Sequence, residues 1–264
     1  MLLYYFLTFF VLATFCRADS IPIAPAPWNL TVSEAYAFVV APPPSPAFLP
    51  PGFADPLEAP ELAPGVILPD SGLIMILRYS ASPVDDELIY IPGRWAYNLT
   101  DSGLRITRIY VATNASVFNG KDSLSASEHQ ADFNFTKLAD GSQTVTVFPP
   151  GDLTNPHFSA KLTPTIGPVP IEVNTALTSD HLTFIQPSIP ASPTNPVEVG
   201  TTTWKQVLLN IQTETWTATV ISGALPGGKI GNGIGYPDIQ PLLPIGVSWS
   251  GPLIFPAPSI VPNL

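Results

Sequence analysis

The stretch "SGLIMILRYSASPVDDELIYIPGRW", residues 71–95, decides the fold class of this chain. Residues 72–79 form a nearly continuous apolar run that is typical of a buried strand, and residues 87–95 alternate more clearly between apolar and polar side chains. The intervening "SPVDD" is a turn signal. The stretch therefore predicts two strands in an antiparallel connection.

Segments of the same kind recur along the chain, and no amphipathic helix of 12 residues, internal repeat or domain linker interrupts them. They are "NLTVSEAYAFVV" (29–40), "RITRIYVAT" (105–113), "SQTVTVFPP" (142–150), "HFSAKLTP" (157–164), "HLTFIQPS" (181–188) and "WKQVLLNIQTETWTATVI" (204–221). The pattern predicts one mainly β domain of sandwich or barrel type with few short helices. The last residues, 251–264, are expected to form an extended segment on the surface.

The chain opens with an apolar run, residues 2–16, followed by the small-x-small site Cys16-Arg17-Ala18. This pattern predicts a signal peptide over residues 1–18, cleaved to release a secreted protein without a stable membrane span. An uncleaved anchor is the alternative, although the run is shorter than the ~20 apolar residues of a typical span. Residues 19–264 then form the single domain, with a proline-rich N-terminal arm over about residues 19–65.

Cysteine and charge narrow the function classes. Cys16 is the single cysteine and lies in the predicted signal peptide, so no disulfide or Cys-ligated metal is expected in the mature chain. The formal net charge is −10 and no Lys/Arg cluster is present, which argues against nucleic acid as a partner. Sequons at Asn29, Asn98, Asn114 and Asn134 predict a glycoprotein.

The spacing of the histidines and a glycine-rich run do not indicate a metal site or a phosphate site. His129, His157 and His181 lack metal-ligand spacing, so neither a metal site nor a cofactor is expected. The glycine run "GGKIGNGIGYP", residues 227–237, is followed by proline rather than by a helix, and it predicts a loop instead of a phosphate site.

Three acids, Asp85, Asp86 and Glu87, stand at the turn and at the start of the following strand. The two aspartates are expected at a solvated hairpin tip. Glu87 begins an apolar strand, and an inward side chain there would have a pKa raised by burial. Glu87 is therefore a candidate acid–base group.

The order and spacing of "SGLIMILRYSASPVDDELIYIPGRW", "RITRIYVATNASVFNG", "HQADFNF" and "NPHFSA" resemble the acetoacetate decarboxylase-like superfamily, and most closely its fungal branch. The resemblance extends from about residue 25 to residue 196. It implies an antiparallel, cone-like β-barrel around an internal cavity that holds a small-molecule ligand, and possible homo-oligomers. It also implies Schiff-base chemistry at a lysine.

The residues that this chain has at the matching positions do not fit Schiff-base chemistry. Aligning Asn119-Gly120, taken as a turn, and Ala131-x-Phe133 with the family pattern places Glu128 at the position of the reactive lysine, with His129 after it. A carboxylate cannot form an imine. Lys121, expected to be exposed beside the turn, and Lys137, on the outgoing strand, are the neighbouring amines. Glu87 matches a glutamate of the family's pocket.

Glu128 also has a structural interpretation. Ser125-x-x-Glu128 fits a capping box, which predicts a short helical turn from Ser127 to about Asp132. Glu128 would then stabilise a helix end rather than take part in a reaction.

Three functions stay open at this point, and it is uncertain whether the chain is an enzyme. In the first, the chain is a secreted decarboxylase-like protein without Schiff-base activity that binds a small apolar or carboxylic ligand. In the second, it is a lyase or hydrolase with Glu87, Glu128 and His129 as acid–base groups. In the third, it is a non-catalytic cell-surface or wall-associated protein that interacts through its proline-rich arm.

Overall fold

The computed structural model describes residues 21–44, 49–58, 65–68, 70–81, 85–98, 101–170, 172–177 and 182–262. The predicted signal peptide and His181 lie outside these residues. Strands dominate the described chain, as predicted: β1 (Trp28–Val40), β2 (Val66–Ile67), β3 (Gly72–Ala81), β4 (Glu87–Ile91), β5 (Arg94–Ala96), β6 (Ser102–Leu104), β7 (Arg108–Val111), β8 (Glu128–Gln130), β9 (Asp132–Lys137), β10 (Gln143–Phe148), β11 (Phe158–Val169), β12 (Val173–Asn174), β13 (Thr183–Gln186), β14 (Lys205–Leu208), β15 (Asn210–Thr213), β16 (Trp216–Gly223), β17 (Ile245–Phe255) and β18 (Ser259–Ile260). The helices within the described ranges are α1 (Asn114–Leu124) and the 3-10 helix η2 (Thr175–Leu177).

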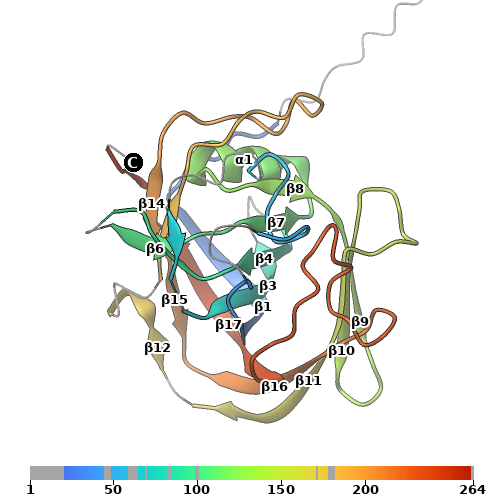
Figure 1. The fold of residues 1–264 in the computed structure, drawn as a ribbon. Helices are drawn as coiled ribbons and strands as arrows, with labels where there is room; N and C mark the ends of the chain where they lie inside the picture. Colours follow the sequence, from blue (N-terminus) through green and yellow to red (C-terminus); the bar gives the residue numbers. More distant parts are fainter. Residues whose placement is uncertain are drawn as a thin grey trace, which may run out of the picture.

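The larger sheet has the strand order β8-β7-β4-β3-β1-β17-β16-β11-β10-β9. It curves strongly, so that β9, β10 and β11 stand beside the central strands β1, β3 and β4 (Figure 1). The strands β3 and β4 pair antiparallel, with Leu77 opposite Glu87, which confirms the connection predicted from residues 71–95. The nearly closed, mainly β architecture confirms the predicted barrel-like fold class.

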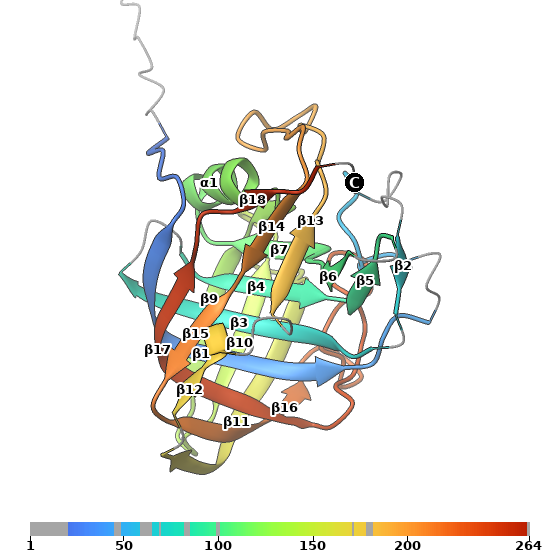
Figure 2. The ribbon, with the colours of Figure 1, turned by 90° about the vertical axis from the view of Figure 1, so that its left-hand side faces the viewer.

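A smaller sheet, in the order β18-β14-β13-β6-β5-β2, lies against the larger one. Figure 2 shows β13 and β14 in front of β3 and β4, with α1 near the upper end of these strands. The strand β15 continues from β14 and pairs with β17, which links the two sheets. The central strands are therefore covered on both faces.

Each face of the central strands carries its own hydrophobic core because successive side chains of a strand point to opposite sides. The first core lies between the central strands and β13, β14 and β17; it includes Met75, Leu77, Ile89, Ile91, Val111, Phe184, Val207 and Leu253. The second core lies inside the curl of the larger sheet; it includes Ile74, Ile76, Leu88, Tyr90, Val145, Val147 and Phe158. Every side chain of the fully buried β4 therefore points toward one core or the other.

Parts of the proline-rich residues 19–65 belong to this packing. β1 is a central strand of the larger sheet, and Phe53 and Asp55 are buried. The side chain of Asn119 on α1 accepts a hydrogen bond from the backbone N–H of Ala24 (2.8 Å) and donates one to the carbonyl oxygen of Pro22 (3.0 Å). These contacts fasten the start of the described chain to the helix.

The expectation of a surface segment over residues 251–264 is wrong for its first half. Residues 251–255 complete β17, which pairs with β1 on one side and with β16 on the other. Leu253 and Phe255 are buried in the first core. The prolines suggested a surface segment, but the alternate apolar side chains between them fill the core.

The predicted capping box at Ser125 is also wrong. The helix α1 comes earlier: Thr113 is its N-cap, with a side-chain oxygen that accepts from the N–H of Ser116, and Ser125 ends it in the left-handed conformation, with φ of 56°. Gly120 lies inside α1 rather than in a turn, and Glu128 begins β8. Small and polar residues occupy much of the buried side of α1, so no apolar repeat marked it in the sequence.

Candidate functional site

Glu87 opens β4 and points into the first core, on the same face as Ile89. Its residue surface is 4% exposed, and the hydroxyl of Tyr79 donates a hydrogen bond to Oε2 at 3.0 Å. Burial raises the pKa of Glu87 to about 8, although the bond from Tyr79 opposes this effect. The carboxyl group therefore carries a proton over much of the neutral range.

Glu128 opens β8 and faces the same core, because β8 pairs in parallel with β7 and Glu128 lies beside Ile109. Burial raises its pKa well above the usual range; the Coulombic effect of Glu87 adds to the rise, while Lys121 and the N–H of Gly120 oppose it. None of the described residues hydrogen-bonds to its Oε2. Two carboxyl groups with raised pKa values thus share one interior.

The expectation that Lys121 is exposed is wrong. Lys121 is fully buried, and it shares a face of α1 with Val117 and Leu124, which both belong to the first core. No described residue accepts a hydrogen bond from its Nζ. Lys137, by contrast, has a side chain that is 76% exposed and forms an ion pair with Glu34 at 3.2 Å.

We define the interior cluster as Tyr79, Glu87, Lys121 and Glu128. Next to it, a cavity of about 20 Å³ is lined by apolar side chains that include Leu77, Ile89 and Leu124. This volume suits about one water-sized group. The interior cluster thus combines a primary amine, two carboxyl groups and a phenol in apolar surroundings, a set of groups that can bind a small acid or transfer protons.

His129 follows Glu128 on β8 and points to the opposite face of the sheet. Its Nε2 contacts a carboxylate oxygen of Asp55, and its Nδ1 lies 2.9 Å from Oε1 of Glu198. Burial disfavours the imidazolium, but the hydrogen bonds to these two carboxylates outweigh burial and raise the pKa of His129. The structure therefore brings Glu87 and Glu128 together and places His129 apart from them.

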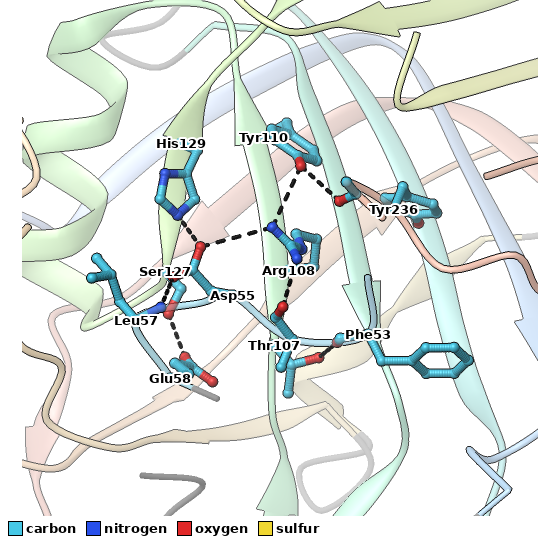
Figure 3. Close-up of polar contacts among 12 residues, drawn as sticks. Phe53, Asp55, Leu57, Glu58, Thr107, Arg108, Tyr110, Ser127, His129 and Tyr236 are labelled. Atoms are coloured by element: carbon cyan, nitrogen blue, oxygen red, sulfur yellow. Dashed lines mark hydrogen bonds and ion pairs between the residues drawn. The ribbon is translucent and has the colours of Figure 1, made fainter. Parts of the chain in front are cut away.

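Figure 3 shows the residues around His129. Asp55 comes from the segment after β1, and Arg108 on β7 donates from Nη2 to the carbonyl oxygen of Ala54 at 2.5 Å. Tyr110, two residues further along the same strand, donates its hydroxyl to the carbonyl oxygen of Gly235 at 2.7 Å. We define the outer cluster as Asp55, Arg108, Tyr110, His129, His157 and Glu198.

The segment that supplies Asp55 also carries Glu58, which is fully buried. Glu58 accepts hydrogen bonds from Nη2 of Arg105 at 3.1 Å and from the hydroxyl of Ser127. Ser127 and His129 are thus both held by this segment, while Glu128 between them points inward. Sequence patterns did not indicate Asp55, Arg108 or Glu198, since their partners come from distant segments.

Three other expectations from the sequence concern glycosylation, metal ions and membrane spans. All four sequon asparagines are exposed: Asn29, Asn98, Asn114 and Asn134. Within the described ranges, no group of three or more His, Cys, Asp or Glu side chains could hold a metal ion. The same ranges contain no helix with the length and apolar character required to cross a membrane.

No protein-family model matches the chain, and no curated protein matches it. Solved structures do match. An acetoacetate decarboxylase from Legionella pneumophila aligns with a TM-score of 0.55 at 11% identity, over 90% of this chain and 88% of the other. An acetoacetate decarboxylase-like enzyme from Sphingomonas wittichii RW1 aligns with a TM-score of 0.55 at 12% identity, over 92% and 95% of the chains.

A third match is the enduracididine biosynthesis enzyme MppR in complex with pyruvate. It aligns with a TM-score of 0.52 at 12% identity, over 92% of this chain and 93% of that chain. At such identities the likeness concerns the fold alone. This chain therefore has the acetoacetate decarboxylase-like fold, as the resemblance implied.

Proposed function

We propose that this chain binds a small carboxylic acid at the interior cluster, and that Glu128 replaces the lysine with which the fold's founding enzymes form an imine. One observation carries the proposal: the amine of Lys121 is fully buried, and no described residue accepts a hydrogen bond from it. Buried polar groups in folded proteins are nearly always bonded. A ligand that accepts hydrogen bonds would satisfy the amine.

The charges of the interior cluster favour an acid as that ligand. Burial raises the pKa values of Glu87 and Glu128, that of Glu87 to about 8, which favours the protonated carboxyl group as a hydrogen-bond donor, and the amine of Lys121 is a donor as well. Donors of this kind suit a carboxylate, which accepts only.

The neighbouring cavity limits the rest of the ligand. It is apolar and measures about 20 Å³, so it accepts an alkyl group of very few atoms unless the side chains of the first core move apart. The terminal methyl groups of short-chain acids and of 2-oxo or 3-oxo acids are of this size. One protein of the same fold was solved with pyruvate, which supports this ligand class.

A second candidate function is a lyase that uses the same cluster. A buried primary amine to which no described residue is hydrogen-bonded is free to form an imine with a ketone that reaches it. Glu87, with a pKa of about 8, is poised to exchange a proton near neutral pH. In this mechanism Lys121 would form the imine and Glu87 or Glu128 would move protons, while His129 would not participate.

A binding and trapping experiment separates the two candidates. The folded chain is titrated with propionate, pyruvate and acetoacetate, and each mixture is then treated with borohydride and examined by peptide mass spectrometry. Saturable binding without an adduct supports the first function. An adduct on Lys121 establishes the second, and absence of binding by all three acids refutes both.

Matched variants locate the binding site. Lys121→Met keeps the apolar stem and removes the amine, so it should abolish binding, whereas Lys137→Met at an exposed position should not. Circular dichroism checks that both variants are folded. Equal affinity of Lys121→Met and the unaltered chain would contradict both candidate functions.

We further propose that the protein is a secreted glycoprotein related to the fungal branch of the superfamily. The predicted signal peptide and the exposure of all four sequon asparagines support this localisation. Expression in a eukaryotic host, followed by amidase treatment and mass measurement of the secreted chain, tests it. Retention of the chain inside the cell without glycans would contradict it.

A further inference from the structure

The outer cluster borders a cavity of about 650 Å³ on the face of the sheet opposite the interior cluster. Its polar walls include Asp55, Arg108, Tyr110, His129, His157 and Glu198. The proposed interior ligand does not use this cavity. Its volume falls within the range of small-molecule sites.

The charges of this cavity cancel within it. Asp55 and Glu198 have lowered pKa values because their contacts with His129 outweigh burial, and the same contacts raise the pKa of His129. Oδ2 of Asp55 also lies 3.9 Å from Nη1 of Arg108, so each acidic group of the cavity has a basic partner within it. An anionic ligand would meet the two carboxylates, and a cationic ligand would meet the guanidinium and the imidazolium. The balance favours a ligand without net charge.

The walls nevertheless offer many hydrogen bonds. Arg108 lines the cavity with 5% of its surface exposed, and no described residue accepts a hydrogen bond from its Nε. The carboxylates accept, while Arg108 and the amide of Asn195 donate. A hydroxyl group both donates and accepts, so a compound with several hydroxyl groups can bond to these side chains without disturbing their ion pairs.

An aromatic surface completes the cavity. The rings of Tyr110 and His157 stack with their centroids 5.1 Å apart and an angle of 20° between their planes. Burial, followed by the charge of Arg108, lowers the pKa of His157, so this ring is neutral near pH 7. Flat, uncharged rings pack well against the apolar face of a pyranose.

We propose that the cavity of the outer cluster binds a neutral sugar of one or two residues. Arg108 and Asn195 would donate to sugar oxygens, Glu198 would accept from sugar hydroxyls, and His157 would contact the ring, while the buried Asp55 would hold His129 in place.

The test is a titration with glucose, mannose, galactose, N-acetylglucosamine and their disaccharides, followed by ligand-observed NMR and calorimetry. The chain is produced without N-linked glycans, because Asn114 lines the cavity and lies in a sequon. We expect one or more sugars to bind with a Kd of about 0.1–10 mM. Glycine, a zwitterion without net charge, is included to show whether the cavity instead binds a ligand with paired opposite charges.

Variants at the rim decide whether binding occurs in this cavity. Ile234 lines it and is 77% exposed, so Ile234→Trp should narrow the opening without altering a core and should weaken sugar binding at least tenfold. Leu177→Trp, at an equally exposed position that does not line the cavity, should leave it unchanged. Lys121→Met should also leave it unchanged, which separates this proposal from the proposed function.

Three results would overturn the proposal. They are the failure of every sugar to bind the folded chain, equal binding by Ile234→Trp, and binding of glycine in place of the sugars.

Discussion

The carboxyl group of Glu128 packs directly against the α-carbon of Gly120, at a helical position where a side chain would overlap it. The helix α1 and the strand β8 meet at this point. A glycine inside a helix ordinarily costs about 1 kcal/mol relative to alanine. Here its lack of a side chain makes room for the carboxyl group, so helix propensity and packing oppose each other.

We therefore predict that Gly120→Ala lowers the free energy of unfolding by about 1–3 kcal/mol, as is typical of overpacking, in spite of the better helix propensity of alanine. In a Glu128→Ala background the same change should be neutral or stabilising. Urea unfolding of the four chains gives the coupling energy of the pair. Additive effects would show that the two residues do not meet.

A second prediction concerns pH. Burial raises the pKa of Glu87 from its ordinary value of 4.5 in the unfolded chain to about 8, so between these values the folded chain binds more protons than the unfolded chain. The free energy of unfolding should then fall as pH rises from 4.5 to 8, by about 1.4 kcal/mol per pH unit for this group. Its contribution is fully present below pH 4.5.

Glu87→Gln removes the titration and keeps a neutral, hydrogen-bonding side chain. The variant should lose that part of the slope, which is measured from urea unfolding at a series of pH values. The exposed Glu214 is a suitable control, and Glu214→Gln should keep the slope of the unaltered chain. A profile for Glu87→Gln that matches the unaltered chain would show that Glu87 is not protonated in the fold.

A third prediction concerns His129. His129→Ala leaves the carboxylates of Asp55 and Glu198 without their shared partner, and Asp55 is fully buried. The loss should be about 3–5 kcal/mol, the usual cost of breaking a buried ion pair. Asp55→Asn in the same chain should recover part of it. A loss below about 1 kcal/mol would contradict this role.

A fourth prediction addresses the last long strand. Leu253→Ala should lower the free energy of unfolding by about 2–5 kcal/mol, because Leu253 is fully buried in the first core. Leu242→Ala, at a position 52% exposed, should change stability by less than about 0.5 kcal/mol. Similar effects of both changes would place residues 251–255 on the surface, as the prolines alone suggested.

The sequence predicted the strands and singled out Glu87 as an acid–base candidate on condition that its side chain points inward, because both inferences depend on local alternation of apolar and polar residues. It did not predict the burial of Lys121, since α1 has no apolar repeat to show which side faces the core. The partners of His129 were also hidden: Glu198 lies 69 residues further along the chain, and only the folded arrangement brings the two together.

The segment with Asp55 and Glu58 has a consequence for how the two faces of the sheet communicate. It contacts Ser127, which directly precedes β8, and His129 within β8, on either side of the inward-pointing Glu128. A ligand that displaces this segment at the outer cluster would shift the strand on which the interior cluster depends. The two sites would then be thermodynamically linked, so that occupancy of either one changes the affinity of the other by the same factor.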